Sequence, residues 1–169
     1  MDKKKLNRMI LVALMVAISF VGANIKLPGP FSTIALDSFS AYFAGVLMGG
    51  VAGGVVGLLG HLMTSFLSGF PFGLPIHAVI GLMMFVSVYV FSAVSKKLNW
   101  VLGAIVGVLI NGILMPAALT FMPGFEWGMA VAFMPMLAAA SAVNIALAII
   151  VYNAVAKTDF ANGFRNNEI

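Results

Sequence analysis

The chain has 169 residues, of which 62% are apolar and only 8% are charged. A soluble domain carries about 25% charged residues, so nine basic and five acidic side chains are too few to cover a soluble globule of this size. This composition excludes a water-soluble enzyme or a nucleic-acid-binding module. The small, separated basic groups form no stripe for phosphates, so we expect no nucleic acid partner. The surface is instead expected to face the lipid bilayer.

The charged residues divide the sequence into apolar stretches that can cross a membrane, which takes about 20 residues for each helix. Three of these stretches hold one span each, whereas 58 uncharged residues separate Asp37 from Lys96. The basic N-terminal segment and the Lys96–Lys97 pair are assigned to the cytoplasm by the positive-inside rule. An even number of crossings must separate two cytoplasmic points, so the long stretch is expected to hold three spans.

The sequence therefore predicts an all-α integral membrane protein, a compact bundle of six transmembrane helices in a single domain over residues 1–169, with both termini cytoplasmic. Glycine and proline clusters mark the turns between the spans. The expected spans cover residues 8–25, 36–49, 51–68, 76–95, 98–121 and 129–156.

In this topology three loops face outward, at residues 26–35, 68–75 and 122–128. Each contains proline, glycine and phenylalanine, a composition that suits either the mouth of a pocket or aromatic anchors at the membrane interface. Polar residues at depth in a membrane are candidates for function. The candidate substrate-binding residues at the outer ends of the spans and within them are Asp37, His77, Asn111, Phe125, Glu126, Trp127 and Asn144.

Structural roles compete with binding at several of these positions. Asn111 and Asn144 suit a hydrogen bond between helices as well as they suit a ligand contact. His61, in a glycine-lined stretch, is interpreted as a packed histidine rather than a ligand. Two carboxylates and a single lysine lie near the outer face, and an anion site usually presents arginine. We therefore expect a neutral or mildly cationic guest.

The sequence shows no sign of catalysis. It lacks the spaced motifs of zinc peptidases, serine hydrolases and phosphate-binding loops, so the chain is not expected to be an enzyme or to use ATP by itself. Without cysteine there is no thiolate metal site and no disulfide framework. We expect no cofactor and no bound metal.

Small residues at intervals of four form the strongest pattern. Gly45, Gly49, Gly53 and Gly57 follow one another at this spacing, which lets helix backbones approach closely in lipid. The run predicts a tight hairpin of the second and third spans. Ala13 and Ala17 repeat the spacing on the first span, where they suit either a partner helix or packing inside the bundle.

These motifs resemble those of the substrate-binding S components of energy-coupling factor (ECF) transporters, which are prokaryotic vitamin importers. Ala13-Leu-Met-Val-Ala17 is similar to the Ala-x-x-x-Ala motif of the family's first helix. The segment Phe43-Ala-Gly-Val-Leu-Met-Gly-Gly-Val-Ala-Gly-Gly-Val-Val-Gly57 is similar to its glycine-rich hairpin. The basic N-terminus and six spans in fewer than 200 residues complete the likeness, which covers essentially the whole chain.

The resemblance implies a multi-pass protein of a prokaryotic plasma membrane that captures a vitamin or a precursor on its outer side. It also implies a membrane T component, which Ala13 and Ala17 would contact, and two cytoplasmic ATPases. The family's guests vary, and a neutral or cationic heteroaromatic such as thiamine, its hydroxymethylpyrimidine moiety or α-ribazole fits the outer charges best. A self-sufficient ion-coupled carrier and a ligand-free membrane scaffold are the alternatives.

Overall fold

The computed structural model describes residues 2–27, 34–158 and 161–163. The regular elements of the described chain are helices and one antiparallel pair of two-residue strands, which aligns Lys26 with Ala35. The elements in chain order are α1 (Lys3–Ala23), β1 (Lys26–Leu27), β2 (Ile34–Ala35), α2 (Phe39–Met48), α3 (Gly50–Leu67), α4 (Leu74–Lys97), α5 (Trp100–Leu109), the π-helix η1 (Ile110–Leu114), α6 (Met115–Leu119) and α7 (Trp127–Val155).

Local sequence explains where the helices begin and end. The Asp2 side chain caps α1 by accepting a hydrogen bond from the backbone N–H of Lys4, and Asn99 caps α5 in the same way from Leu102. Gly49 separates α2 from α3 with a φ of 105°, and Gly73 precedes α4 with a φ of 81°. Both conformations suit glycine, which has no Cβ.

Five helical stretches are long and apolar enough to cross a membrane, counting α5, η1 and α6 together as residues 100–119. The remaining one, α2, has ten residues and is about 15 Å long, which is half the thickness of the hydrocarbon core. The second span was expected at residues 36–49, whereas the helix covers Phe39–Met48. The expected span is too long because Leu36–Ser38 is not helical. The described structure supplies five spans by length, and a sixth crossing through α2 stays a prediction.

The short helix α2 lies at the centre of the bundle. It packs against α1, α3, α4 and α7, and every residue from Ser40 to Met48 is buried. Its glycine-rich hairpin with α3 is the one that the small-residue spacing predicts. The outer helices, by contrast, expose large apolar side chains such as Leu14, Phe66 and Ile150, as expected for a surface that contacts lipid.

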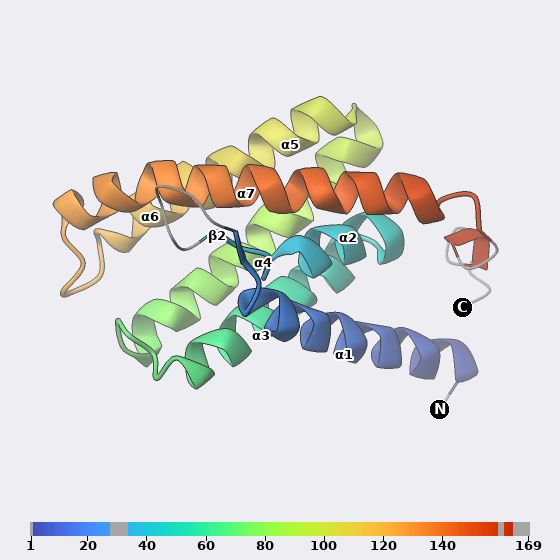
Figure 1. Ribbon diagram of the computed structural model, residues 1–169, viewed down its shortest axis with the longest axis horizontal. Coiled ribbons are helices and arrows are strands. Elements are labelled where there is room, and N and C mark those ends of the chain that lie inside the picture. The colour runs from blue at the N-terminus through green and yellow to red at the C-terminus, as the bar shows by residue number, and fades with distance from the viewer. Residues whose placement is uncertain (1, 28–33, 159–160, 164–169) are drawn as a thin grey trace.

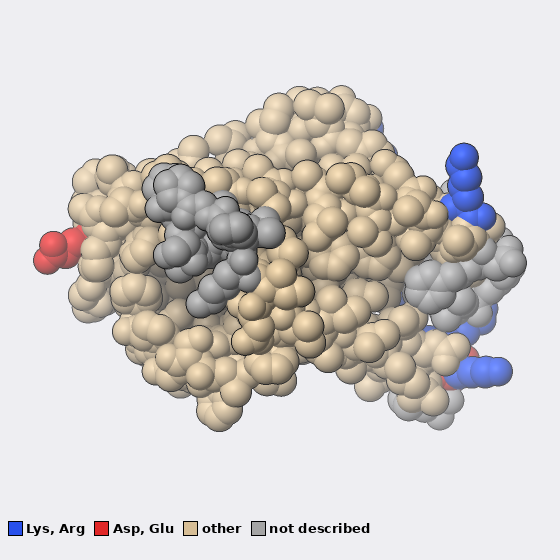
Figure 2. All heavy atoms as spheres, viewed as in Figure 1, with Lys and Arg blue, Asp and Glu red and all other residues tan. Residues whose placement is uncertain are grey.

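The two ends of the molecule differ in charge. The start of α1 and the end of α7 lie at the same end of the bundle, and α7 runs along its whole length (Figure 1). Lysine and arginine side chains gather at that end, while an acidic side chain marks the opposite end (Figure 2). The basic residues belong to the start of α1, the end of α4 and the segment after α7. This polarity agrees with the expectation that both termini are cytoplasmic, which stays a prediction.

Candidate functional site: a cavity between α3, α4 and α7

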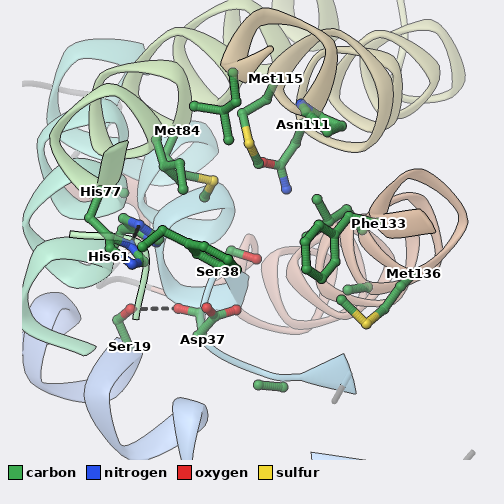
Figure 3. Close-up of a pocket in the computed structure, with 18 of the residues that line it drawn as sticks. Ser19, Asp37, Ser38, His61, His77, Met84, Asn111, Met115, Phe133 and Met136 are labelled. Carbon is green, nitrogen blue, oxygen red and sulfur yellow. Dashed lines mark hydrogen bonds between the residues drawn. The ribbon is translucent and has the colours of Figure 1, made fainter. Parts of the chain in front are cut away.

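A half-enclosed cavity of about 250 Å³ lies in the half of the bundle away from the start of α1 and the end of α7. The cavity is bounded by the C-terminal half of α3, the N-terminal halves of α4 and α7, the segment η1–α6 and the residues before α2. Figure 3 shows side chains from all of these elements directed toward the same space.

The walls of the cavity are aromatic and thioether groups with a few polar side chains between them. The apolar groups include Phe72, Phe125, Phe133, Met84, Met115 and Met136, and the polar ones are Ser19, Asp37, Ser38, His61, His77 and Asn111. Among the described lining residues there is no lysine or arginine. A mostly apolar cavity with a few convergent polar groups is the usual form of a small-molecule site.

Asp37 lies on the cavity wall in the turn between β2 and α2. The Ser19 hydroxyl of α1 donates a 2.5 Å hydrogen bond to the Asp37 backbone carbonyl, which fixes the turn against α1 (Figure 3). Burial raises the pKa of the Asp37 carboxyl above its ordinary value, although hydrogen bonds with Ser38 and the local backbone oppose the shift. The carboxyl group is the one acidic group among the described lining residues.

Asn111 reaches the cavity from the π-helical turn η1. Pro116, which follows this turn, has no backbone N–H to donate to the preceding turn, and the wider π turn accommodates that break. The Asn111 side-chain NH₂ donates to the Ser141 hydroxyl at 2.7 Å, and that hydroxyl donates to the Leu137 carbonyl at 2.6 Å. Because Ser141 has used its proton, it accepts from Asn111, and the buried Asn111 Oδ1 has no partner among the described residues.

Asn144 is placed differently from Asn111. It is fully buried and does not line the cavity. Its side-chain NH₂ donates to the carbonyls of Ala35 and Ala140, both at 2.9 Å. These bonds join β2 to α7, so Asn144 positions two residues that do line the cavity.

The aromatic candidates after α6 divide into an inner and an outer set. Phe125 is buried on the cavity wall, and its ring contacts Phe72 and Phe133 at centroid distances of 5.8 and 6.2 Å. Glu126 and Trp127 follow directly but are exposed, and neither lines the cavity.

Two histidines lie side by side in the cavity, although the sequence predicts a binding role for His77 and only a packing role for His61. His77, at the start of α4, and His61, in α3, both line it, and their ring nitrogens are 3.2 Å apart. His61 lies six residues before the end of α3 and His77 three residues after the start of α4. Residues near the same turn can meet across a helical hairpin, so the short distance of both histidines from this turn was the available signal for His61.

Other lining residues had no distinguishing signal in the sequence. Met84, Met115 and Phe133 are apolar residues in apolar helices, and only the packing of α4, α6 and α7 brings them to one cavity. Among the described residues, no group of three or more His, Cys, Asp or Glu side chains could hold a metal ion.

The first helix presents a separate surface. Ala13 and Ala17 are both exposed on α1. Ala13, with Val12 and Val16, lines an open groove whose other wall is formed by α3. Ala17 lies one turn further along the helix, outside the residues that line this groove.

The comparisons with known proteins agree with this architecture. A family model described as the substrate-specific component of ECF transporters matches residues 7–156. A solved structure described as "Structure and mechanism of the S component of a bacterial ECF transporter" matches with a TM-score of 0.73 and 20% sequence identity, over 90% of this chain and 96% of that chain. A comparison with curated proteins finds no match.

The fold and the family match define a multi-pass, helical membrane protein with a transporter S-component architecture. The chain belongs to the family of ECF transporter substrate-specific components. The resemblance drawn from the alanine and glycine motifs is thereby confirmed. The family is a class of transport subunits that work with a T component and ATPases, not a class of enzymes.

Proposed function

We propose that this S component captures a flat, neutral or cationic heteroaromatic vitamin or vitamin precursor in the cavity between α3, α4 and α7. The observation that carries the proposal is the cavity's lining, where aromatic and thioether side chains surround a few buried polar atoms and one carboxyl group. Aromatic faces stack on flat rings. The absence of a described basic residue on the wall disfavours guests with carboxylate or phosphate groups.

The residues proposed to contact the guest are Asp37, His77, Asn111 and Phe125, which the cavity brings together. Asn144 is proposed to act through Ala35 and Ala140 rather than by contact. The cavity lies in the half of the bundle opposite the basic end. With the basic end in the cytoplasm, the guest would enter from the outside.

The groove beside Ala13 is proposed as the surface for the membrane T component. Small residues on an exposed helix let a partner helix approach closely in lipid, and the groove continues to Arg8 and Lys5 at the basic end. Two cytoplasmic ATPases would supply the energy through that partner, and the site of action would be a prokaryotic plasma membrane.

The first test is to purify the chain in detergent from cells grown in rich medium, denature it and identify any released small molecule by mass spectrometry. A stoichiometric heteroaromatic vitamin or precursor is expected. A stoichiometric anionic guest would contradict the proposed chemistry.

Transport is tested in proteoliposomes with and without a T component and ATPases, using the released molecule in radiolabelled form. ATP-dependent uptake only in the complete system is expected. Uptake by the chain alone that collapses with the proton or sodium gradient would indicate a self-sufficient carrier instead.

A further inference from the structure

Two side chains on the cavity wall, His77 and Asn111, each carry a buried polar atom without a partner among the described residues, and His77 is the one on an aromatic ring. Its side chain is 6% exposed, its ring lines the cavity, and Nε2 has no hydrogen-bond partner among the described residues. Buried polar atoms in native proteins are nearly always paired, because an unpaired one retains the cost of its desolvation. An unpaired ring nitrogen on a cavity wall therefore indicates a partner that arrives with the guest.

We propose that His77 Nε2, held in place by Ser65 and His61, is the subsite that hydrogen-bonds a polar heteroatom on the edge of the guest ring. This inference rests on the proposed function and assigns the chemistry of one end of its cavity. The guest is accordingly a nitrogen heterocycle, whose edge faces the histidines and whose flat faces lie against the aromatic and thioether walls.

The inner side of the His77 ring is fixed by a three-atom cluster. Its Nδ1 lies 3.0 Å from Ser65 Oγ and 3.2 Å from His61 Nε2, and these two atoms are themselves 3.2 Å apart. Ser65 and His61 are one turn apart on α3, whereas His77 belongs to α4. The cluster therefore joins the two helices and determines the direction in which Nε2 points.

The position of the protons in this cluster determines whether His77 Nε2 donates or accepts a hydrogen bond. Two N–H groups facing each other in the cluster would repel, and so would two lone pairs, so one of the two nitrogens that meet there carries a proton and the other does not. If His61 carries the proton, the neutral His77 ring has its own proton on Nε2 and donates to the guest. If His77 Nδ1 carries it, Nε2 accepts. Depending on the tautomer, His77 Nε2 can thus donate a hydrogen bond to a ring nitrogen of a heterocycle or accept one from its N–H group.

Aromatic rings on the same side of the cavity restrict the guest's orientation. The rings of Phe70 and Phe72 lie 5.7 and 6.1 Å from the His77 ring, and Phe72 also contacts Phe133 at 5.9 Å. A flat ring inserted beside Phe72 can present its edge to Nε2 while its face remains against apolar groups. Figure 3 shows the histidines and Phe133 on opposite sides of the same space.

The test uses two substitutions that separate the two nitrogens of His77. His77→Asn places an amide near the position of Nδ1, so it keeps the contacts with Ser65 and His61 and removes the polar atom that faces the cavity. His77→Gln reaches the position of Nε2. The probes are thiamine, 4-amino-5-hydroxymethyl-2-methylpyrimidine and 5,6-dimethylbenzimidazole, with dissociation constants measured by calorimetry on the full chain in detergent.

At least one probe is expected to bind the wild type. Its affinity should fall about tenfold to a hundredfold in His77→Asn and stay within about fivefold in His77→Gln, with melting temperatures of the unliganded variants close together. Wild-type affinity in His77→Asn, or an equal loss in both variants, would overturn the inference.

A measurement on the wild type keeps the test independent of how the variants fold. 5,6-Dimethylbenzimidazole is compared with 5,6-dimethylindane, which has a similar shape but no ring nitrogen and is more hydrophobic. Tighter binding of the benzimidazole supports a polar subsite, whereas tighter binding of the indane overturns it. If no probe binds but the chain carries a different neutral or cationic heteroaromatic guest, and His77→Asn binds that guest as tightly as the wild type, the inference fails while the proposed function stands. If nothing binds and nothing co-purifies, both fail.

Discussion

The close approach of the α2 and α3 backbones makes a strong prediction about Gly53. A Cβ added at Gly53 would overlap the backbone of Gly45 on α2 and would lie 2.8 Å from the Ala41 carbonyl oxygen. The three nearest atoms, Gly45 Cα, Gly45 N and the Ala41 carbonyl oxygen, all belong to the backbone of the buried helix α2. No side chain can therefore rotate away to make room. Gly53→Ala can be accommodated only if α2 and α3 move apart by roughly 1 Å, which forfeits a large part of the dispersion energy between them.

The magnitude follows from two opposing terms. Overpacking of this kind costs about 3 kcal/mol, and replacing a glycine in a helix interior by alanine returns about 1 kcal/mol of helix propensity. The net loss of about 2 kcal/mol corresponds to a fall in melting temperature of roughly 4–8 °C for a chain of this length.

Gly81→Ala is the matched control. Gly81 is also a buried glycine inside a helix, α4, but an added Cβ would meet Leu58 and Leu62 of α3 at ordinary distances of 3.5–3.7 Å. The propensity term is the same, so only the packing term differs, and Gly81→Ala should melt at or slightly above the wild-type temperature. Thermal unfolding of both variants in one detergent is the assay. If they melt within about 2 °C of each other, the close α2–α3 contact does not limit stability and the reasoning is refuted.

Four further outcomes are expected. Asn144→Ala removes two buried hydrogen bonds to carbonyls and should cost about 1–2 kcal/mol, with weaker guest binding because Ala35 lines the cavity; unfolding and calorimetry measure the two effects. Ala13→Trp fills the groove on α1, so ATP-dependent uptake in proteoliposomes should be lost while guest binding persists. Trp127→Ala removes an exposed side chain outside the cavity, so affinity measured by calorimetry should change less than threefold. The raised pKa of Asp37 means that the native state holds this proton more tightly than the unfolded chain does. The free energy of unfolding should therefore fall as the pH rises from about 3.8 through the native pKa. Asp37→Asn should remove this fall when unfolding is measured over a series of pH values.

The helices and their order follow from composition and charge, whereas the length of the second helix does not. The 58 residues between Asp37 and Lys96 carry no charge, and nothing in their hydropathy separates a membrane span from a buried core helix. The structure begins α2 at Phe39 because the preceding turn is held by the Ser19 hydroxyl and by the Asn144 contact with Ala35. The first of these bonds joins residues 18 positions apart and the second joins residues 109 positions apart. A local sequence pattern cannot predict either of them.

The candidate site shows the same division between local and long-range information. Asp37, His77 and Asn111 stood out because polar groups at depth are rare in a membrane protein, and the structure places all three on one cavity. Glu126 and Trp127 share an aromatic, polar loop with Phe125, yet only Phe125 turns inward. Loop composition indicates proximity to a site, but the side on which each residue lies depends on the first turn of α7.

His61 illustrates how proximity to a turn supplies information that composition does not. By itself it is an isolated histidine among glycines, for which packing is the ordinary explanation. Paired with His77 across the turn between α3 and α4, it becomes part of a polar cluster that fixes the ring facing the cavity. The hairpin of α3 and α4 is also the most extensive helix pair in the bundle, so the histidine pair rests on a rigid support. A recognition group mounted in this way keeps its direction whether or not the cavity is filled, which is what selective capture of a small, flat guest requires.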